Sequence, residues 1–142
     1  MAKRSKQINP CLLFGIIVLL GAVLVYLSIK QSKEGFTSSA NTFDSDVSDG
    51  QKLVWFYADW CGHCKNMHSD WDSAASQINN DDVKMLKVNC GDPKDKAHQK
   101  ITRKYDISGY PTIILLENGE PISEYKDGRT EQDFMAYVSQ NM

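Results

Sequence analysis

Cysteine is scarce in this chain of 142 residues, and its four cysteines are too few to staple a small disulfide-rich scaffold. Neither sign of charge dominates, because 16 basic side chains nearly balance 18 acidic ones. The charged share of 24% is ordinary, which excludes wholesale disorder and a collagen-like repeat. The length suits one modest domain once any tail or anchor is set aside.

The near-neutral net charge of −2 conceals two regions of opposite charge. Residues 1–34 carry five basic side chains against one acidic side chain, whereas residues 35–142 carry 11 basic and 17 acidic side chains. The larger, acidic region lacks the basic excess that nucleic-acid binding requires. We therefore expect no nucleic-acid partner.

The longest uncharged stretch lies near the N-terminus. Residues 12–29 hold no charged side chain and are dominated by Leu, Ile and Val. As a helix they span about 27 Å, close to the thickness of a membrane core. This pattern predicts a single-pass membrane protein, with a transmembrane anchor at residues 11–29 that follows a basic cytosolic tail at residues 1–10. A cleaved signal peptide is the alternative, although its apolar region is usually shorter.

The side of the membrane follows from the flanking charges. The basic residues of the tail outnumber those just after the apolar stretch, so we expect a cytosolic N-terminus and a lumenal or extracytosolic folded domain. The endoplasmic reticulum, a bacterial envelope and a viral membrane all fit. Cys11, at the cytosolic edge, is either a small apolar residue or a palmitoylation site. Residues 30–49, rich in Ser, Thr, Asp and Gly, predict a flexible linker, with room for a short ordered piece near Phe43, before the domain at residues 50–142.

Within residues 50–142, the spacing of apolar residues alternates between the periods of strands and helices. It predicts strands over residues 52–58, 83–89, 112–116 and 122–125, with a hairpin turn at Asn118-Gly119. It predicts three helices: one that ends near residue 78, one that runs from about residue 92 to residue 105, and one that begins at residue 130. This order indicates an α/β fold with strands of mixed direction.

Cys61 and Cys64 form a Cys-x-x-Cys pair at the junction between a buried strand and a helix. One helical turn brings the two sulfur atoms together, so they can close a redox-active disulfide. The helix N-terminus favours the thiolate of Cys61, and His63 between the cysteines can lower its pKa further. Cys64 lies one turn deeper and is better placed to resolve a mixed disulfide than to start one.

A zinc site is the alternative interpretation of the cysteines. Four potential ligands are present: Cys61, Cys64, His68 and Cys90. Structural zinc sites usually combine two close pairs of ligands, and Cys90 has no near partner in the sequence. The apolar strand and Trp60 before the pair also favour dithiol chemistry, so no metal is assigned. His68 and His98 are expected on helix surfaces without a role, and Cys90 as a half-buried free thiol.

The segments Trp60-Cys61-Gly62-His63-Cys64-Lys65 and Gly109-Tyr110-Pro111-Thr112 resemble the thioredoxin superfamily, specifically the catalytic domains of protein disulfide isomerases. The 47-residue separation of Cys64 and Pro111 agrees with this resemblance. It implies a thioredoxin fold with a mixed central sheet flanked by helices and no cofactor. Because the stretch between the apolar segment and Gln51 is short for the family's first strand and helix, we expect both to be shortened.

The resemblance also implies roles for residues outside the dithiol. A cis Tyr110–Pro111 bond is expected, with the backbone of Tyr110 pairing with an extended substrate beside Cys61 and Trp60. Arg129 resembles an arginine that approaches the buried cysteine and favours its thiolate, although a solvated side chain is an equal alternative. The sequence departs from the family at Trp55, where members usually carry a buried carboxylate that accepts the proton of the second cysteine.

These features together predict a membrane-anchored thiol–disulfide oxidoreductase of the disulfide-isomerase type. Cys61 exchanges disulfides with thiols and disulfides of proteins or peptides, Cys64 resolves the mixed species, and a thiol oxidase or reductase recycles the pair. Two alternatives stay open: a non-catalytic module that holds client proteins near Tyr110 and Pro111, and a zinc-binding domain.

Overall fold

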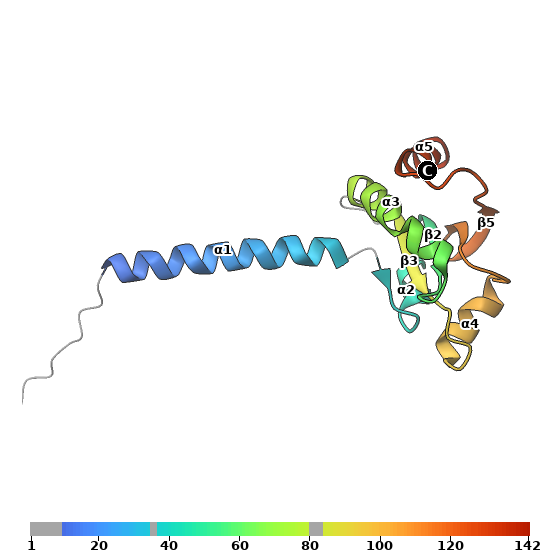
Figure 1. Ribbon diagram of the computed structural model, residues 1–142, viewed down its shortest axis with the longest axis horizontal. Coiled ribbons are helices and arrows are strands. Elements are labelled where there is room, and N and C mark those ends of the chain that lie inside the picture. Colours follow the sequence, from blue (N-terminus) through green and yellow to red (C-terminus); the bar gives the residue numbers. More distant parts are fainter. Residues whose placement is uncertain (1–9, 35–36, 80–83) are drawn as a thin grey trace, which may run out of the picture. The chain divides into compact units, whose positions relative to one another are not determined.

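The computed structural model describes residues 10–34, 37–79 and 84–142 (Figure 1). The chain divides into two compact units, Met1–Gly35 and Phe36–Met142. The first unit contains helix α1, Pro10–Glu34, whose side chains are described from Phe14 to Tyr26. Within the described part of the chain, no helix combines the length and the apolar character needed to cross a membrane. The anchor predicted at residues 11–29 is therefore not confirmed, and residues 1–9 and the Cys11 side chain lie outside the described set.

The second unit is built on a five-stranded mixed sheet with the strand order β1-β3-β2-β4-β5. Its strands are β1 Thr37–Ser38, β2 Gln51–Tyr57, β3 Met85–Asn89, β4 Thr112–Glu117 and β5 Glu120–Glu124. β3 runs parallel to both β1 and β2, while β4 is antiparallel to β2 and to β5. This arrangement agrees with the predicted α/β fold of mixed strand direction.

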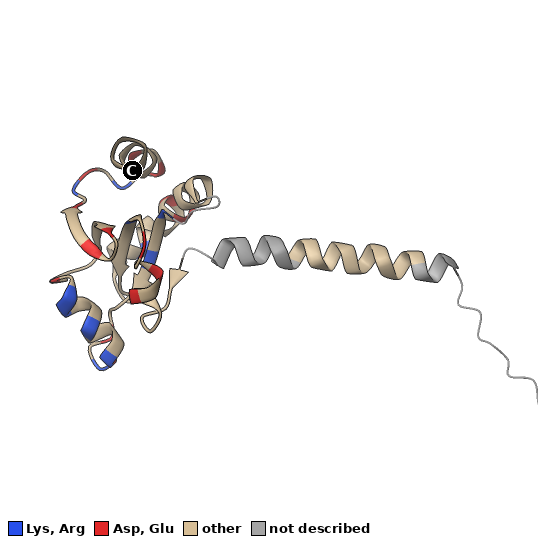
Figure 2. Ribbon diagram, turned by 180° about the vertical axis from the view of Figure 1, so that it is seen from behind, with Lys and Arg blue, Asp and Glu red and all other residues tan. Residues whose placement is uncertain are grey.

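Alternating residues of β2 build two cores, one on each face of the sheet. Leu53, Trp55 and Tyr57 face α3 (Gly62–Ile78) and α5 (Glu131–Asn141). Val54 and Phe56 face α2 (Phe43–Asp46) and α4 (Lys96–Lys104). Figure 2 shows several of the domain's basic residues along α4. The central strand is thus buried on both faces, as its continuous apolar run predicts.

The predicted ends of several elements are confirmed. Asn118 and Gly119 join β4 to β5 with φ angles of 52° and 80°, the left-handed conformation of a tight hairpin turn. Thr130 and Asp133 form a reciprocal capping box at the start of α5. The second predicted strand begins at Met85 rather than residue 83, which lies outside the described residues.

The flexible linker predicted for residues 30–49 is wrong over most of its length. Helix α1 continues to Glu34, and β1 pairs with β3 through Thr37 and Ser38. Phe43 and Val47 are fully buried against the α4 face of the sheet. Two apolar side chains four residues apart are enough to dock one helical turn, although the segment is otherwise polar. The expected shortening is confirmed, because β1 has two residues and α2 has four.

Candidate active site

The two cysteines of the Cys-x-x-Cys pair lie at the start of α3, just beyond the C-terminal end of β2. Cys61 is the N-cap residue, with extended backbone angles of −77° and 117°. Its sulfur accepts a hydrogen bond from the backbone N–H of Cys64 at 3.3 Å. The sulfur therefore takes the place of the oxygen of a capping Ser or Asp, where the helix dipole favours negative charge. This confirms the predicted junction of strand and helix.

The second cysteine is held in a different environment. Cys64 is completely buried, Cys61 is 6% exposed, and both are free thiols. Burial raises the pKa of Cys64 to about 12, and the neighbouring Cys61 raises it as well. At neutral pH, Cys64 therefore keeps its proton and needs a base before it can attack another sulfur atom.

Tyr110 and Pro111 approach the dithiol from the segment before β4. The Tyr110–Pro111 peptide bond is cis, as the family resemblance implies. The Cys61 thiol donates a hydrogen bond to the carbonyl oxygen of Tyr110 at 3.5 Å. The structure therefore brings the backbone of Tyr110 and the nucleophilic sulfur together, although 49 residues separate them in sequence.

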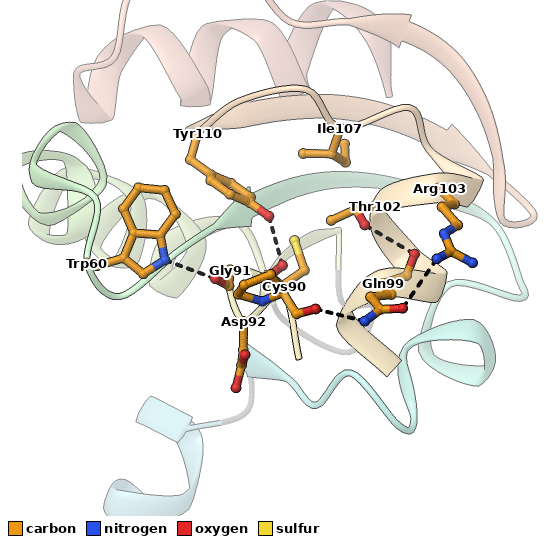
Figure 3. A pocket seen from close by; sticks show the side chains of 10 residues that line it. Trp60, Cys90, Gly91, Asp92, Gln99, Thr102, Arg103, Ile107 and Tyr110 are labelled. Carbon is orange, nitrogen blue, oxygen red and sulfur yellow. Dashed lines mark hydrogen bonds between the residues drawn. The ribbon is translucent and has the colours of Figure 1, made fainter. Parts of the chain in front are cut away.

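Trp60 forms an exposed wall beside this site, with 68% of its surface accessible. Its indole N–H donates to the carbonyl of Gly91 at 2.9 Å, and its ring stands edge-on to Tyr110 at 5.7 Å. The Tyr110 hydroxyl donates to the carbonyl of Cys90 at 2.7 Å. These bonds hold the two aromatic rings at the mouth of a cavity of about 520 Å³ (Figure 3).

The far wall of this cavity comes from α4 and was missed by sequence reasoning. Gln99, Thr102 and Arg103 line it opposite Trp60. The guanidinium of Arg103 donates to the side chain of Gln99 at 3.3 Å, and the Gln99 amide donates to the carbonyl of Pro93 at 2.7 Å. No short motif marks these residues, because they reach the site only through the packing of α4 on the sheet.

The two predicted pKa-tuning residues lie on the surface. His63 is exposed on the first turn of α3. Arg129 is exposed just before α5 and lines a second cavity, of about 290 Å³, together with Pro111. Its positive charge lowers the pKa of Cys64, although burial outweighs this effect. The two alternatives for Arg129 are thus both partly correct, because it is solvated and still acts on the buried thiol.

Trp55 fills the position where the family usually has a buried carboxylate, and it is completely buried. His68, expected on a helix surface, instead packs its ring against Trp55 at 4.7 Å and Tyr57 at 5.3 Å. Beside it, the ammonium of Lys87 contacts the carboxylate of Asp72 at 2.5 Å. A polar cluster therefore borders the aromatic residues below Cys64, and the four-residue spacing of Cys64, His68 and Asp72 was its signal in the sequence.

The zinc alternative receives no support. In residues 10–34, 37–79 and 84–142, no group of three or more His, Cys, Asp or Glu side chains is arranged to hold a metal ion. His68 lies against Trp55 and Tyr57 on the α3 face of the sheet, whereas Cys90 belongs to the core on the opposite face. The four candidate ligands Cys61, Cys64, His68 and Cys90 are therefore divided between the two faces.

Comparison with known sequences identifies related proteins. The sequence profile of the family described as Thioredoxin matches residues 35–140. Protein disulfide-isomerase A6 of Mus musculus is 36% identical over 98 residues, which cover 68% of this chain and 22% of that protein. A protein disulfide-isomerase of Ricinus communis is 32% identical over 128 residues, covering 86% of this chain and 26% of the relative. The chain thus spans about a quarter of the length of these curated relatives.

Solved structures show the same similarity. The first thioredoxin domain of mouse protein disulfide-isomerase A4 superposes with a TM-score of 0.59 at 31% identity, covering 73% of this chain and 72% of that one. The zinc-bound form of human ERp44 superposes with a TM-score of 0.63 at 29% identity, covering 73% of this chain and 29% of that one.

Proposed function

Because the chain belongs to the thioredoxin family, we propose that it is a thiol–disulfide oxidoreductase that exchanges disulfides through Cys61 and Cys64. One observation carries the proposal: the sulfur of Cys61 caps α3 and lies against the carbonyl of Tyr110. A nucleophilic sulfur is therefore held at a helix N-terminus, next to backbone that an extended substrate can approach. The relatives named protein disulfide-isomerase support the same reaction class.

The reaction proceeds in two exchange steps. The Cys61 thiolate attacks one sulfur of a substrate disulfide, so that a mixed disulfide forms and the other substrate sulfur leaves as a thiolate. Cys64 then attacks the Cys61 sulfur, closes the Cys61–Cys64 disulfide and releases the second substrate sulfur. The two cysteines lose two electrons and the substrate disulfide gains them. The reverse sequence inserts a disulfide into a dithiol substrate.

The proposed substrates are cysteine side chains of proteins or peptides. Trp60 offers exposed aromatic surface and stands edge-on to the half-buried Tyr110, which suits an extended polypeptide segment. The Gly-His pair between the cysteines resembles the isomerases, which have potentials near −180 mV, more than thioredoxin, near −270 mV. We therefore favour oxidation and isomerisation over reduction, with a thiol oxidase or reductase that resets the pair.

The proposal includes attachment to a membrane through residues 11–29, with the N-terminus cytosolic and the folded unit on the lumenal or extracytosolic side. The uncharged stretch over residues 12–29 and the basic residues before it support this location. Protease treatment of sealed vesicles tests the orientation. Protection of residues 36–142 until detergent is added supports it, and cleavage without detergent contradicts it.

A disulfide-trapping experiment tests the reaction itself. Cys64→Ser in the full chain should accumulate mixed disulfides with a disulfide-bonded peptide, because the resolving thiol is missing. The matched control, Cys61→Ser, should form none through Cys64, which is buried and keeps its proton at neutral pH. Failure of the Cys64→Ser chain to form a mixed disulfide would contradict the proposal.

A non-catalytic client-binding module is the second candidate function, and Trp55 is the observation that favours it. Without a carboxylate at that position, the usual proton acceptor for the second cysteine is absent. The trapping experiment separates the two functions, because a pure binding module retains peptide without any covalent bond to Cys61.

A further inference from the structure

None of the site residues discussed above has been identified as the base that takes the proton from the Cys64 thiol. The thiol is completely buried with a pKa raised to about 12, yet resolution of a mixed disulfide requires its thiolate. Trp55, which is completely buried in the same core, has no titratable group. A proton acceptor must therefore come from another element that borders the same core.

Three chemically complementary side chains follow one another along α3. Cys64, His68 and Asp72 are spaced four residues apart, so each lies one turn above the last on the same side of the helix. Side chains at this spacing have Cβ atoms about 5–6 Å apart. The three groups follow in the order thiol, imidazole and carboxylate, so that each group can exchange a proton with its neighbour or change the pKa of that neighbour.

Two aromatic residues of β2 fix the position of the imidazole. The ring of Tyr57 contacts the imidazole of His68 at 5.3 Å. The ring of Trp55, two residues earlier on the same face of β2, contacts the imidazole at 4.7 Å. Trp55, Tyr57 and Cys64 belong to the same buried core. The imidazole therefore borders the core that contains Cys64.

We infer that His68 accepts the proton of Cys64 when Cys64 resolves the mixed disulfide, and that Asp72 and Lys87 adjust how readily it does so. The inference rests on the proposed function. The proton moves from the Cys64 sulfur to an imidazole nitrogen, directly or through one water molecule. The Cys64 sulfur then bonds to the Cys61 sulfur, the bond from Cys61 to the substrate breaks, and the substrate sulfur leaves with the electron pair. His68 returns the proton to solvent.

The surroundings of His68 suit a base. Burial lowers the pKa of His68 below its usual value, which favours the neutral imidazole, the form that can accept a proton. Charged groups reach it from three sides: Lys87 of β3 lowers its pKa, whereas Asp72 of α3 and Asp59 of the loop before α3 raise it. The ammonium of Lys87 in turn contacts the carboxylate of Asp72 at 2.5 Å, so a change in either charge also alters the effect of the other on His68.

A pH profile of the resolving step tests the inference. The reduced full chain is mixed with glutathione disulfide, quenched with acid at successive times, and analysed by mass spectrometry for the glutathione adduct on Cys61. In the unmodified chain, the resolution rate should rise with pH through the pKa of His68 and then level off. His68→Gln should slow resolution about 100-fold at neutral pH and replace the plateau with a steady rise with hydroxide concentration. His98→Gln, a matched change on α4, should leave the profile unaltered.

Two further variants keep the test independent of any loss of folding in His68→Gln. Asp72→Asn removes a charge that raises the pKa of His68, so the inflection should move to lower pH. Lys87→Gln removes a charge that lowers this pKa, so the inflection should move to higher pH. A purely structural role predicts no such opposite shifts.

The outcomes separate this inference from the proposed function. An unchanged profile in His68→Gln, or shifts in the same direction for the Asp72 and Lys87 variants, would overturn the role of His68 while exchange through Cys61 stands. Absence of both the glutathione adduct on Cys61 and the Cys61–Cys64 disulfide in the unmodified chain would instead contradict the proposed function itself.

Discussion

The two faces of the central sheet each hold a buried thiol, yet only one of these thiols belongs to a reactive arrangement. Cys64 lies on the α3 face and Cys90 on the α4 face, and burial raises the pKa of the first to about 12 and of the second to about 11. Burial therefore does not distinguish them. Cys64 differs in having a second thiol one helical turn away and a line of polar side chains along its own helix.

The residues around the two thiols explain this difference. The α4 face is closed by edge-on aromatic contacts of Phe43 with Phe56 at 5.6 Å and with Tyr105 at 5.7 Å. The α3 face instead contains the Lys87–Asp72 pair and the buried indoles of Trp55 and Trp71, whose N–H groups lack hydrogen-bond partners among the described residues. Unpaired buried polar groups reduce stability, and native proteins concentrate such compromises at functional sites. Both faces hold large buried aromatic side chains and so contribute to stability, whereas the dithiol and the Lys87–Asp72 pair lie on the α3 face.

Replacement of Cys61, compared with replacement of Cys90, should give the largest contrast. Cys61→Ala should reduce thiol–disulfide exchange with a peptide substrate to the uncatalysed background, because it removes the thiolate that begins the reaction. Cys90→Ala, its matched control, should leave the rate unchanged. Exchange that persists in Cys61→Ala, measured by fluorescence of a disulfide-linked peptide, would remove the distinction between the faces.

A substitution in the α4-face core should change stability without changing chemistry. Phe43→Ala should lower the free energy of unfolding by about 3–5 kcal/mol, because it empties a completely buried aromatic site. Urea denaturation under reducing conditions measures the loss. The variant should still form mixed disulfides through Cys61 while it is folded, and selective loss of exchange by the folded variant would argue against separate roles for the faces.

Alkaline pH should weaken the protein through both buried thiols. Because folding raises the pKa values of Cys64 and Cys90, their contribution to stability is complete below the ordinary thiol pKa near 9. It is lost as the pH rises through about 11 to 12, since the unfolded chain releases these protons more easily. The free energy of unfolding should therefore fall above pH 9, and less steeply in Cys90→Ala. If the free energy of unfolding fell equally steeply above pH 9 in Cys90→Ala, the buried thiol of Cys90 would not be a cause of the fall.

The smallest effect is expected at the start of α5, which covers the α3 face. Thr130→Ala removes the hydroxyl that accepts from the N–H of Asp133 and should cost about 1 kcal/mol of stability. Thr130→Ser keeps that hydroxyl and serves as the control. Thermal unfolding of both variants checks the prediction, and equal losses would show that the capping bond contributes nothing.

Sequence patterns predicted features that depend on neighbouring residues in the chain. The strand before Cys61, the Asn118-Gly119 turn and the capping box at Thr130 all follow from local spacing and are confirmed. A short ordered piece near Phe43 was expected and is present, but the polar composition around it suggested a linker, whereas tertiary packing of a single turn decides its position.

The candidate site also combines features that have a local signal in the sequence with features that have none. The pairing of Cys61 with Tyr110 was expected only from the family resemblance, because 49 residues separate them. The approach of Lys87 to Asp72, and of Arg103 to the cavity beside Trp60, depends on how β3 and α4 pack and has no local signal. His68 had such a signal in its spacing from Cys64, but spacing alone does not distinguish a surface histidine from one packed against Trp55.

The reduction potential of the Cys61–Cys64 pair tests the central claim most directly. The full chain is equilibrated with glutathione buffers of defined ratio, and the fraction of the dithiol that is oxidised is measured by mass after alkylation. The account predicts a reversible two-electron couple nearer to −180 mV than to −270 mV. A potential near −270 mV would contradict the oxidising direction, and the absence of a reversible couple would contradict thiol–disulfide exchange itself.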